Sequence, residues 1–84
     1  MTRCITVFTK DYDRFSDVYE EIINTQFEDE EEKEIDGITF SSSGDVPDEY
    51  IERMKEKQDV AVMNEKKRGI TIVQHGEVFE IFLS

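Results

Sequence analysis

Residues 78–83 place large apolar side chains on both of their faces, and this constrains the fold more than any other feature. Alternate residues of an extended chain point to opposite sides. One side therefore carries Val78 and Phe82, and the other carries Phe79, Ile81 and Leu83. Strands that are apolar on both sides need cover on both sides. We expect either helices on opposite faces of a sheet, or one sheet face that meets another chain.

Two helices are predicted. Apolar residues recur at helical spacing between Phe15 and Ile23, and Asp11 or Asp13 can cap the start of that helix. A shorter helix is expected over residues 47–58, because Pro47 suits a first helical position and acidic residues follow it.

The remaining segments favour strands. Residues 3–9 are rich in β-branched and aromatic side chains, and Asp36-Gly37 suits a two-residue turn between residues 28–35 and 38–43. Residues 60–63, 70–74 and 78–83 are expected to form a three-stranded meander. A helix running on through residues 60–63 was the alternative, but Val60 and Val62 at alternate positions favour a strand.

Together these elements predict an α+β fold with a mostly antiparallel sheet and two helices, in the order β-α-β-β-α-β-β-β. The 84 residues are expected to form a single small acidic domain with a small core. The lone Cys4 excludes an intramolecular disulfide, and no segment is typical of a signal peptide or a membrane span. We therefore expect a cytoplasmic protein.

The net charge of −11 comes entirely from the first 49 residues, while the segment from Tyr50 onward is balanced. Such polarity bears on solubility and on the choice of partner rather than on fold. Its densest part is the run 28–34, with six carboxylates and Lys33. If extended, this run carries about one net charge per 4.6 Å, close to the roughly 3.4 Å spacing along one DNA strand. Two interpretations stay open here, a solvated loop and an imitation of a phosphate backbone.

Catalytic and metal sites find little support in the sequence. Asp11 and Asp13 begin like a calcium loop, but the glycine and glutamate that such a loop needs do not follow. The run 41–44 is expected to serve as a turn and cap, and His75 is expected to lie in a hairpin turn. Cys4 is predicted to be buried and inert. We predict no metal, no cofactor and no enzyme activity.

The leading functional hypothesis is a small acidic protein-binding module that inhibits a partner by occupying its basic, nucleic-acid-binding surface. In size and acidity the chain is similar to phage-encoded DNA-mimic inhibitors, which include anti-restriction, anti-CRISPR and uracil-DNA glycosylase inhibitor proteins. This is a likeness of composition, so no residue roles follow from it. The expected contact residues are Glu28, Glu30, Glu31, Glu32, Glu34, Asp45, Asp48 and Glu49.

The alternative hypothesis is a homodimeric structural or regulatory domain that pairs through its sheet face, with acids that only confer solubility. Neither hypothesis involves direct contact with nucleic acid or a membrane. Ionic strength separates them, because a charge-driven complex weakens as salt rises whereas an apolar dimer does not.

Overall fold

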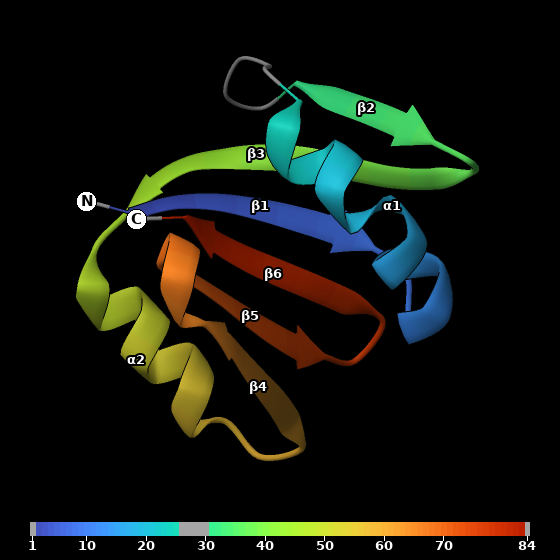
Figure 1. Cartoon of the computed structure of the whole chain (residues 1–84). Coiled ribbons are helices and arrows are strands. Elements are labelled where there is room, and N and C mark those ends of the chain that lie inside the picture. Colours follow the sequence, from blue (N-terminus) through green and yellow to red (C-terminus); the bar gives the residue numbers. More distant parts are fainter. Residues whose placement is uncertain (1, 26–30, 84) are drawn as a thin grey trace.

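The computed structural model describes residues 2–25 and 31–83. Within them, six strands form one antiparallel sheet in the order β2-β3-β1-β6-β5-β4, with two helices (Figure 1). The α+β class and the element order are those predicted from sequence. The strands are β1 (Thr2–Phe8), β2 (Glu32–Ile35), β3 (Ile38–Val46), β4 (Val60–Glu65), β5 (Ile70–His75) and β6 (Val78–Leu83), and the helices are α1 (Tyr12–Asn24), α2 (Asp48–Glu56) and a single 3₁₀ turn, Lys66–Arg68.

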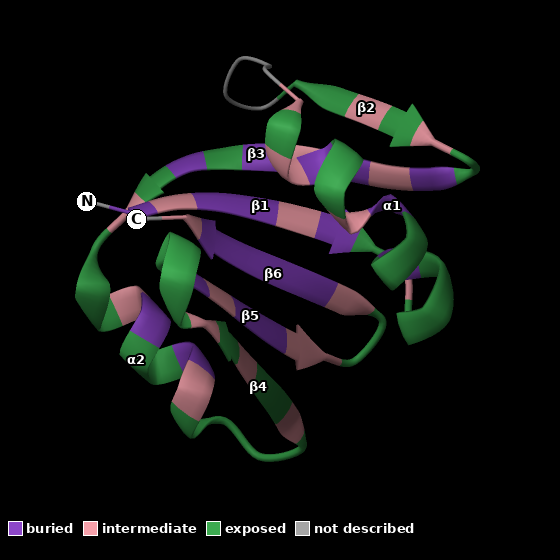
Figure 2. Ribbon diagram, in the orientation of Figure 1, coloured by how far each residue is buried: buried purple, intermediate pink, exposed green. Residues whose placement is uncertain are grey.

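Helix α1 covers one face of the sheet. Asp11 caps it, since its Oδ1 accepts hydrogen bonds from the backbone N–H groups of Asp13 and Arg14. The face of α1 that packs on the sheet carries Phe15, which stacks on Phe79 at a ring-centroid distance of 4.1 Å. The buried core on this face comprises Ile5, Val7, Phe15, Val18, Ile22, Ile38, Phe40, Ile70, Ile72, Phe79 and Ile81 (Figure 2).

Helix α2 covers part of the opposite face of the sheet. Its buried Ile51 and Met54 pack with Cys4, Val73 and Phe82 into a second, smaller core. Each face of β6 therefore packs against a helix. This is the first of the two arrangements that the sequence allowed.

The serine-rich segment confirms one sequence prediction and contradicts another. Residues 38–43 were predicted as a strand, which is confirmed, whereas residues 41–44 were also expected to serve as a turn and cap, which is wrong. Ser41, Ser42 and Ser43 all lie within β3, which continues to Val46 as it pairs with β1. The pairing shifts between Cys4 and Ile5, so β3 holds an extra residue there, as in a β-bulge. Gly44 adopts a φ of +77° beside the bulge. Serine and glycine accommodate irregular backbone and therefore indicated a turn. In the structure the irregular backbone is a bulge within β3.

Two tight turns organise the hairpins. Asp36 and Gly37 both have positive φ, as a type I′ turn requires, and they join β2 to β3 as predicted. The second turn joins β5 to β6 through Gly76 and Glu77, with His75 paired to Val78. The prediction that His75 belongs to the turn was wrong by one position, because His75 ends β5. Its side chain is half-buried, with Nε2 near Glu80.

Candidate functional site

The strand order separates the acidic first half of the chain from its electrically balanced second half. Strands β2, β3 and β1 come from the acidic first half of the chain and form one side of the sheet. Strands β6, β5 and β4 come from the electrically balanced second half and form the other side. The described strands β2, β3 and β1 carry a net charge of only 2 − 3 = −1, from Arg3 and Lys33 against Glu32, Glu34 and Asp45. Most of the surplus negative charge therefore lies on α1, at the start of α2 and in the segments between the elements.

Strand β2 holds the described part of the predicted acidic run. Glu32 and Glu34 are exposed on one face of the strand, about 7 Å apart, while Lys33 and Ile35 are half-buried on the other. Lys33 pairs with Glu31 at 3.4 Å. Glu28 and Glu30, which were expected to continue the row, lie outside the described residues.

The outward face of α1 adds a second row of acids that the sequence analysis did not assign to a site. Asp13, Asp17 and Glu21 follow one another at intervals of four residues, about 6 Å along the helix. All three are exposed, opposite the stripe that packs on the core. The same helical periodicity that located the buried stripe would have located this row.

The two rows belong to neighbouring elements. Arg14, in the first turn of α1, donates from Nη2 to the backbone oxygen of Asp36 at 2.6 Å, which joins the start of α1 to the turn after β2. Ile35 of β2 packs against the same core as α1. Figure 1 shows α1 lying beside the β2–β3 hairpin. Because Lys33 and Ile35 lie on the α1 side of β2, Glu32 and Glu34 point to the face of the sheet opposite the α1 row. We call the two rows together the acidic surface, which flanks the β2 edge on its two sides, and its described members are Asp13, Asp17, Glu21, Glu31, Glu32 and Glu34.

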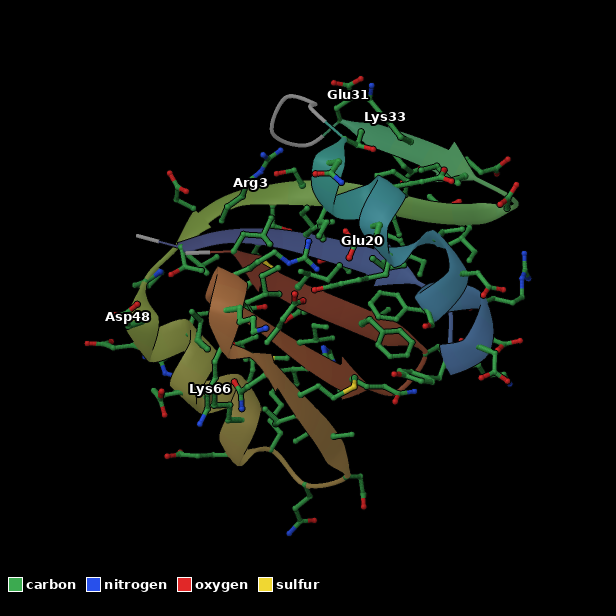
Figure 3. The ribbon with its side chains drawn as sticks, in the orientation of Figure 1. Arg3, Glu20, Glu31, Lys33, Asp48 and Lys66 are labelled. Carbon is green, nitrogen blue, oxygen red and sulfur yellow. The ribbon has the colours of Figure 1, made fainter. Side chains whose placement is uncertain are left out.

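The other predicted contact residues lie apart from this surface. Asp45 is four residues along β3 from Ser41, the partner of Glu32, which corresponds to about 13 Å. Asp48 and Glu49 begin α2, and Glu49 pairs with Arg53 at 3.7 Å. Figure 3 shows Asp48 well away from Glu31 and Lys33. The fold thus brings Glu31, Glu32 and Glu34 together but places Asp45, Asp48 and Glu49 elsewhere.

Glu20 is an acid of α1 whose charge is already compensated. Arg68 donates to both of its carboxylate oxygens, at 2.7 and 3.0 Å, and also to Glu65. These hydrogen bonds lower the pKa of Glu20 and of Glu65. Tyr19 donates to Glu65 at 2.9 Å and lies beneath the Arg68 guanidinium. Because these groups satisfy one another, the cluster ties α1 to the β4–β5 hairpin and adds little to the acidic surface.

A second polar cluster lies beneath α2. Tyr50 donates its hydroxyl to the buried carboxylate of Glu80, at 3.1 and 3.3 Å from the two oxygens. His75 Nε2 lies 3.6 Å from Glu80 Oε1 and has no hydrogen-bond partner within the described chain. The hydroxyl thus compensates part of the cost of burying a carboxylate, and the cluster fixes α2 on the sheet.

Cys4 adjoins this cluster and is expected to be chemically inert. Burial, together with the negative charge of Glu80, raises the pKa of its thiol to about 12. Because the thiolate is the reactive form, an aromatic disulfide reagent at pH 8 should leave native Cys4 unmodified and should react rapidly after denaturation in urea. Equal labelling rates in the two states would contradict the buried placement of Cys4.

Alkaline pH is expected to unfold the domain. Burial raises the pKa of Tyr50 to about 12 and also raises that of Tyr19, in each case with help from a neighbouring glutamate. The unfolded chain loses protons from these groups near 9.0 for Cys4 and 10.0 for tyrosine, whereas the native chain retains them. These three groups therefore leave stability unchanged at neutral pH and lower it as the pH rises between about 9 and 12. Urea midpoints measured across this range test the expectation, and a flat profile would refute it.

Comparison with known proteins assigns neither a family nor a function to this chain. No family model, curated protein or solved structure matches the chain. Across residues 2–25 and 31–83, no group of three or more His, Cys, Asp or Glu side chains is arranged to hold a metal ion. Within the same ranges, no helix is long and apolar enough to cross a membrane.

Proposed function

We propose that the protein is an acidic binding module that inhibits a partner by occupying its basic, nucleic-acid-binding surface. The observation that carries this proposal is the acidic surface, in which α1 and β2 present exposed carboxylates in two rows on opposite faces of the sheet beside the β2 edge. Their spacing of about 6 to 7 Å within each row suits a surface that binds a regularly charged polyanion.

Compensation by basic residues is slight on this surface. Lys33 pairs with Glu31, and Arg14 is directed to the backbone of the β2–β3 turn. By contrast, the guanidinium of Arg68 serves Glu20 and Glu65 on the opposite flank of α1. Asp13, Asp17 and Glu21 on one face and Glu32 and Glu34 on the other thus give the β2 edge a negative field that attracts a cationic surface.

Apolar contact must add to this attraction, because complementary charge mainly sets association rate and partner choice. Tyr12 is 50% exposed and immediately precedes Asp13 at the start of α1. Tyrosine is enriched among the residues that contribute most to binding energy at protein interfaces. Tyr12 is therefore the proposed apolar anchor beside the acidic surface.

The experiment that tests this function is capture of partners from a host lysate with the immobilised protein at low salt. Two baits are compared, the native chain and a variant in which Asp13, Asp17, Glu32 and Glu34 are changed to their amides. We expect a nucleic-acid-binding protein to be retained by the native bait alone and to elute as salt rises. Recovery of the same proteins on both baits would contradict the proposal.

Homodimerisation through the sheet face is the alternative from the sequence, and it stays a prediction. Within the described chain, the large apolar side chains that are exposed are Phe8, Tyr12 and Val62, and they lie on β1, α1 and β4. Phe8 and Val62 share the sheet face that α2 partly covers, but β6 and β5 lie between their strands, so they form no contiguous apolar patch. We therefore do not favour this alternative.

A further inference from the structure

The two edges of the sheet differ in a way that the acidic binding function does not explain. At one end, β2 carries Glu32, Lys33 and Glu34, and charged side chains of this kind discourage pairing with another strand. At the other end, β4 is uncharged from Val60 to Asn64, and Val62 is 38% exposed. In the described chain β4 pairs with β5 alone, so its other side is open (Figure 1).

The backbone groups on the open side of β4 can be assigned from the hairpin geometry. His75 and Val78 close a two-residue turn, so they form a hydrogen-bonded pair. Because hydrogen-bonded and non-hydrogen-bonded pairs alternate along an antiparallel ladder, Gln74 and Ile72 direct their N–H and C=O groups toward β4. The groups of β4 that point away from the sheet are then those of Val60, Val62 and Asn64.

The charge distribution indicates which strand can pair there. Two copies of a chain with a net charge of −11 repel each other, unless they meet where that charge is absent. The β4 edge lies at the opposite end of the sheet from β2, in the half of the chain whose charges balance. Pairing through β4 would separate the two β2 edges by about 50 Å, far beyond the Debye length of roughly 10 Å.

We propose that β4 pairs antiparallel with β4 of a second copy, forming a twelve-stranded sheet with a two-fold axis at Met63. Residues on the same face must oppose each other, so the symmetric registers that pair five residues place either Met63 or Val62 on the axis. With Val62 on the axis, Asp59 would oppose Glu65 of the other copy, which is unfavourable. With Met63 on the axis, Glu65 instead opposes the uncharged Ala61 of the other copy, and Val62 and Asn64 exchange backbone hydrogen bonds across the interface.

The dimer also gives the molecule two acidic surfaces at opposite ends. The inference does not depend on what those surfaces bind, since it rests on the β4 edge alone. Its consequence for the proposed function is bivalence: one dimer could engage two basic sites if their separation matched.

The first test is sedimentation equilibrium of the native chain and of two proline variants. Val62→Pro removes an outward N–H from β4 without breaking the ladder to β5, and Glu34→Pro makes the matched change on β2. We expect native protein and Glu34→Pro to dimerise with similar dissociation constants, and Val62→Pro to dimerise at least about tenfold more weakly. A native chain that is monomeric up to about 1 mM would overturn the proposal. Equal effects of the two proline variants would also overturn it.

The second test needs no variant, so it stands even if Val62→Pro fails to fold. Amide hydrogen exchange is measured on the native chain at concentrations below and above the dimer midpoint. We expect the amides of Val62 and Asn64 to become protected only at high concentration, while those of Ala61 and Met63 are protected throughout. A dimer that leaves Val62 and Asn64 unprotected pairs through another surface, and the proposal would then be wrong.

Discussion

Replacing Phe79 with alanine is expected to lower the free energy of unfolding by about 3 to 5 kcal/mol. The ring is fully buried and stacks on Phe15 at an interplanar angle of 1°, so its loss leaves a cavity between α1 and the sheet. A domain of this size has a total stability near the lower end of about 5 to 15 kcal/mol. The Phe79→Ala variant should therefore retain only about 0 to 2 kcal/mol of stability, so that up to about half of it is unfolded without denaturant.

Urea titrations followed by circular dichroism measure this change, and Phe8→Ala is the control. Phe8 is an aromatic residue of the same sheet but is 48% exposed. Its substitution should change stability by only about 0.5 kcal/mol. A loss below about 1 kcal/mol for Phe79→Ala would mean that α1 does not pack on β6 as described.

Neutralising the acidic surface is expected to slow association with the partner by about ten- to a thousandfold at low salt. The test variant changes Asp13 and Asp17 to asparagine and Glu32 and Glu34 to glutamine. A matched control neutralises four exposed acids from the second half of the chain, Glu52, Glu56, Asp59 and Glu77.

Both variants raise the net charge by four from −11, so they differ only in where the charge is removed. Association rates from surface plasmon resonance should fall steeply for the test variant and little for the control. The test variant should also lose most of the salt dependence seen with the native chain. Equal slowing in both variants would show that total charge, rather than the acidic surface, governs binding.

The fold was largely predictable because the apolar periodicity along this chain is unambiguous. Phe15, Val18 and Ile22 indicated one helix, and Asp36-Gly37 indicated a hairpin; both were confirmed. The bulge in β3 was missed because serine and glycine suit turns and irregular strands equally, and only the pairing with β1 distinguishes the two. The turn between β5 and β6 was placed one residue too early, at His75 and Gly76 rather than at Gly76 and Glu77. Both pairs contain a glycine and suit a two-residue turn equally well.

The candidate site was only partly predictable. A run of acids in sequence indicated Glu31, Glu32 and Glu34, but it gave no sign that α1 lies beside β2 with a second row. Asp45 and Asp48 were expected to add to that run if the fold brought them close, and the sequence could not show whether it does. Long-range contacts such as Arg14 with Asp36, which decide which charges become neighbours, leave no local pattern in the sequence.

The most direct test of the central claim is whether the protein and nucleic acid compete for the captured partner. Fluorescently labelled duplex DNA is bound to the partner at low salt, and the protein is titrated while anisotropy and complex mass are recorded. If the acidic surface imitates a polyanion, the partner releases DNA in proportion to the protein that it binds. The variant in which Asp13, Asp17, Glu32 and Glu34 are all changed to their amides should release little DNA. A stable ternary complex of partner, DNA and protein would contradict the claim.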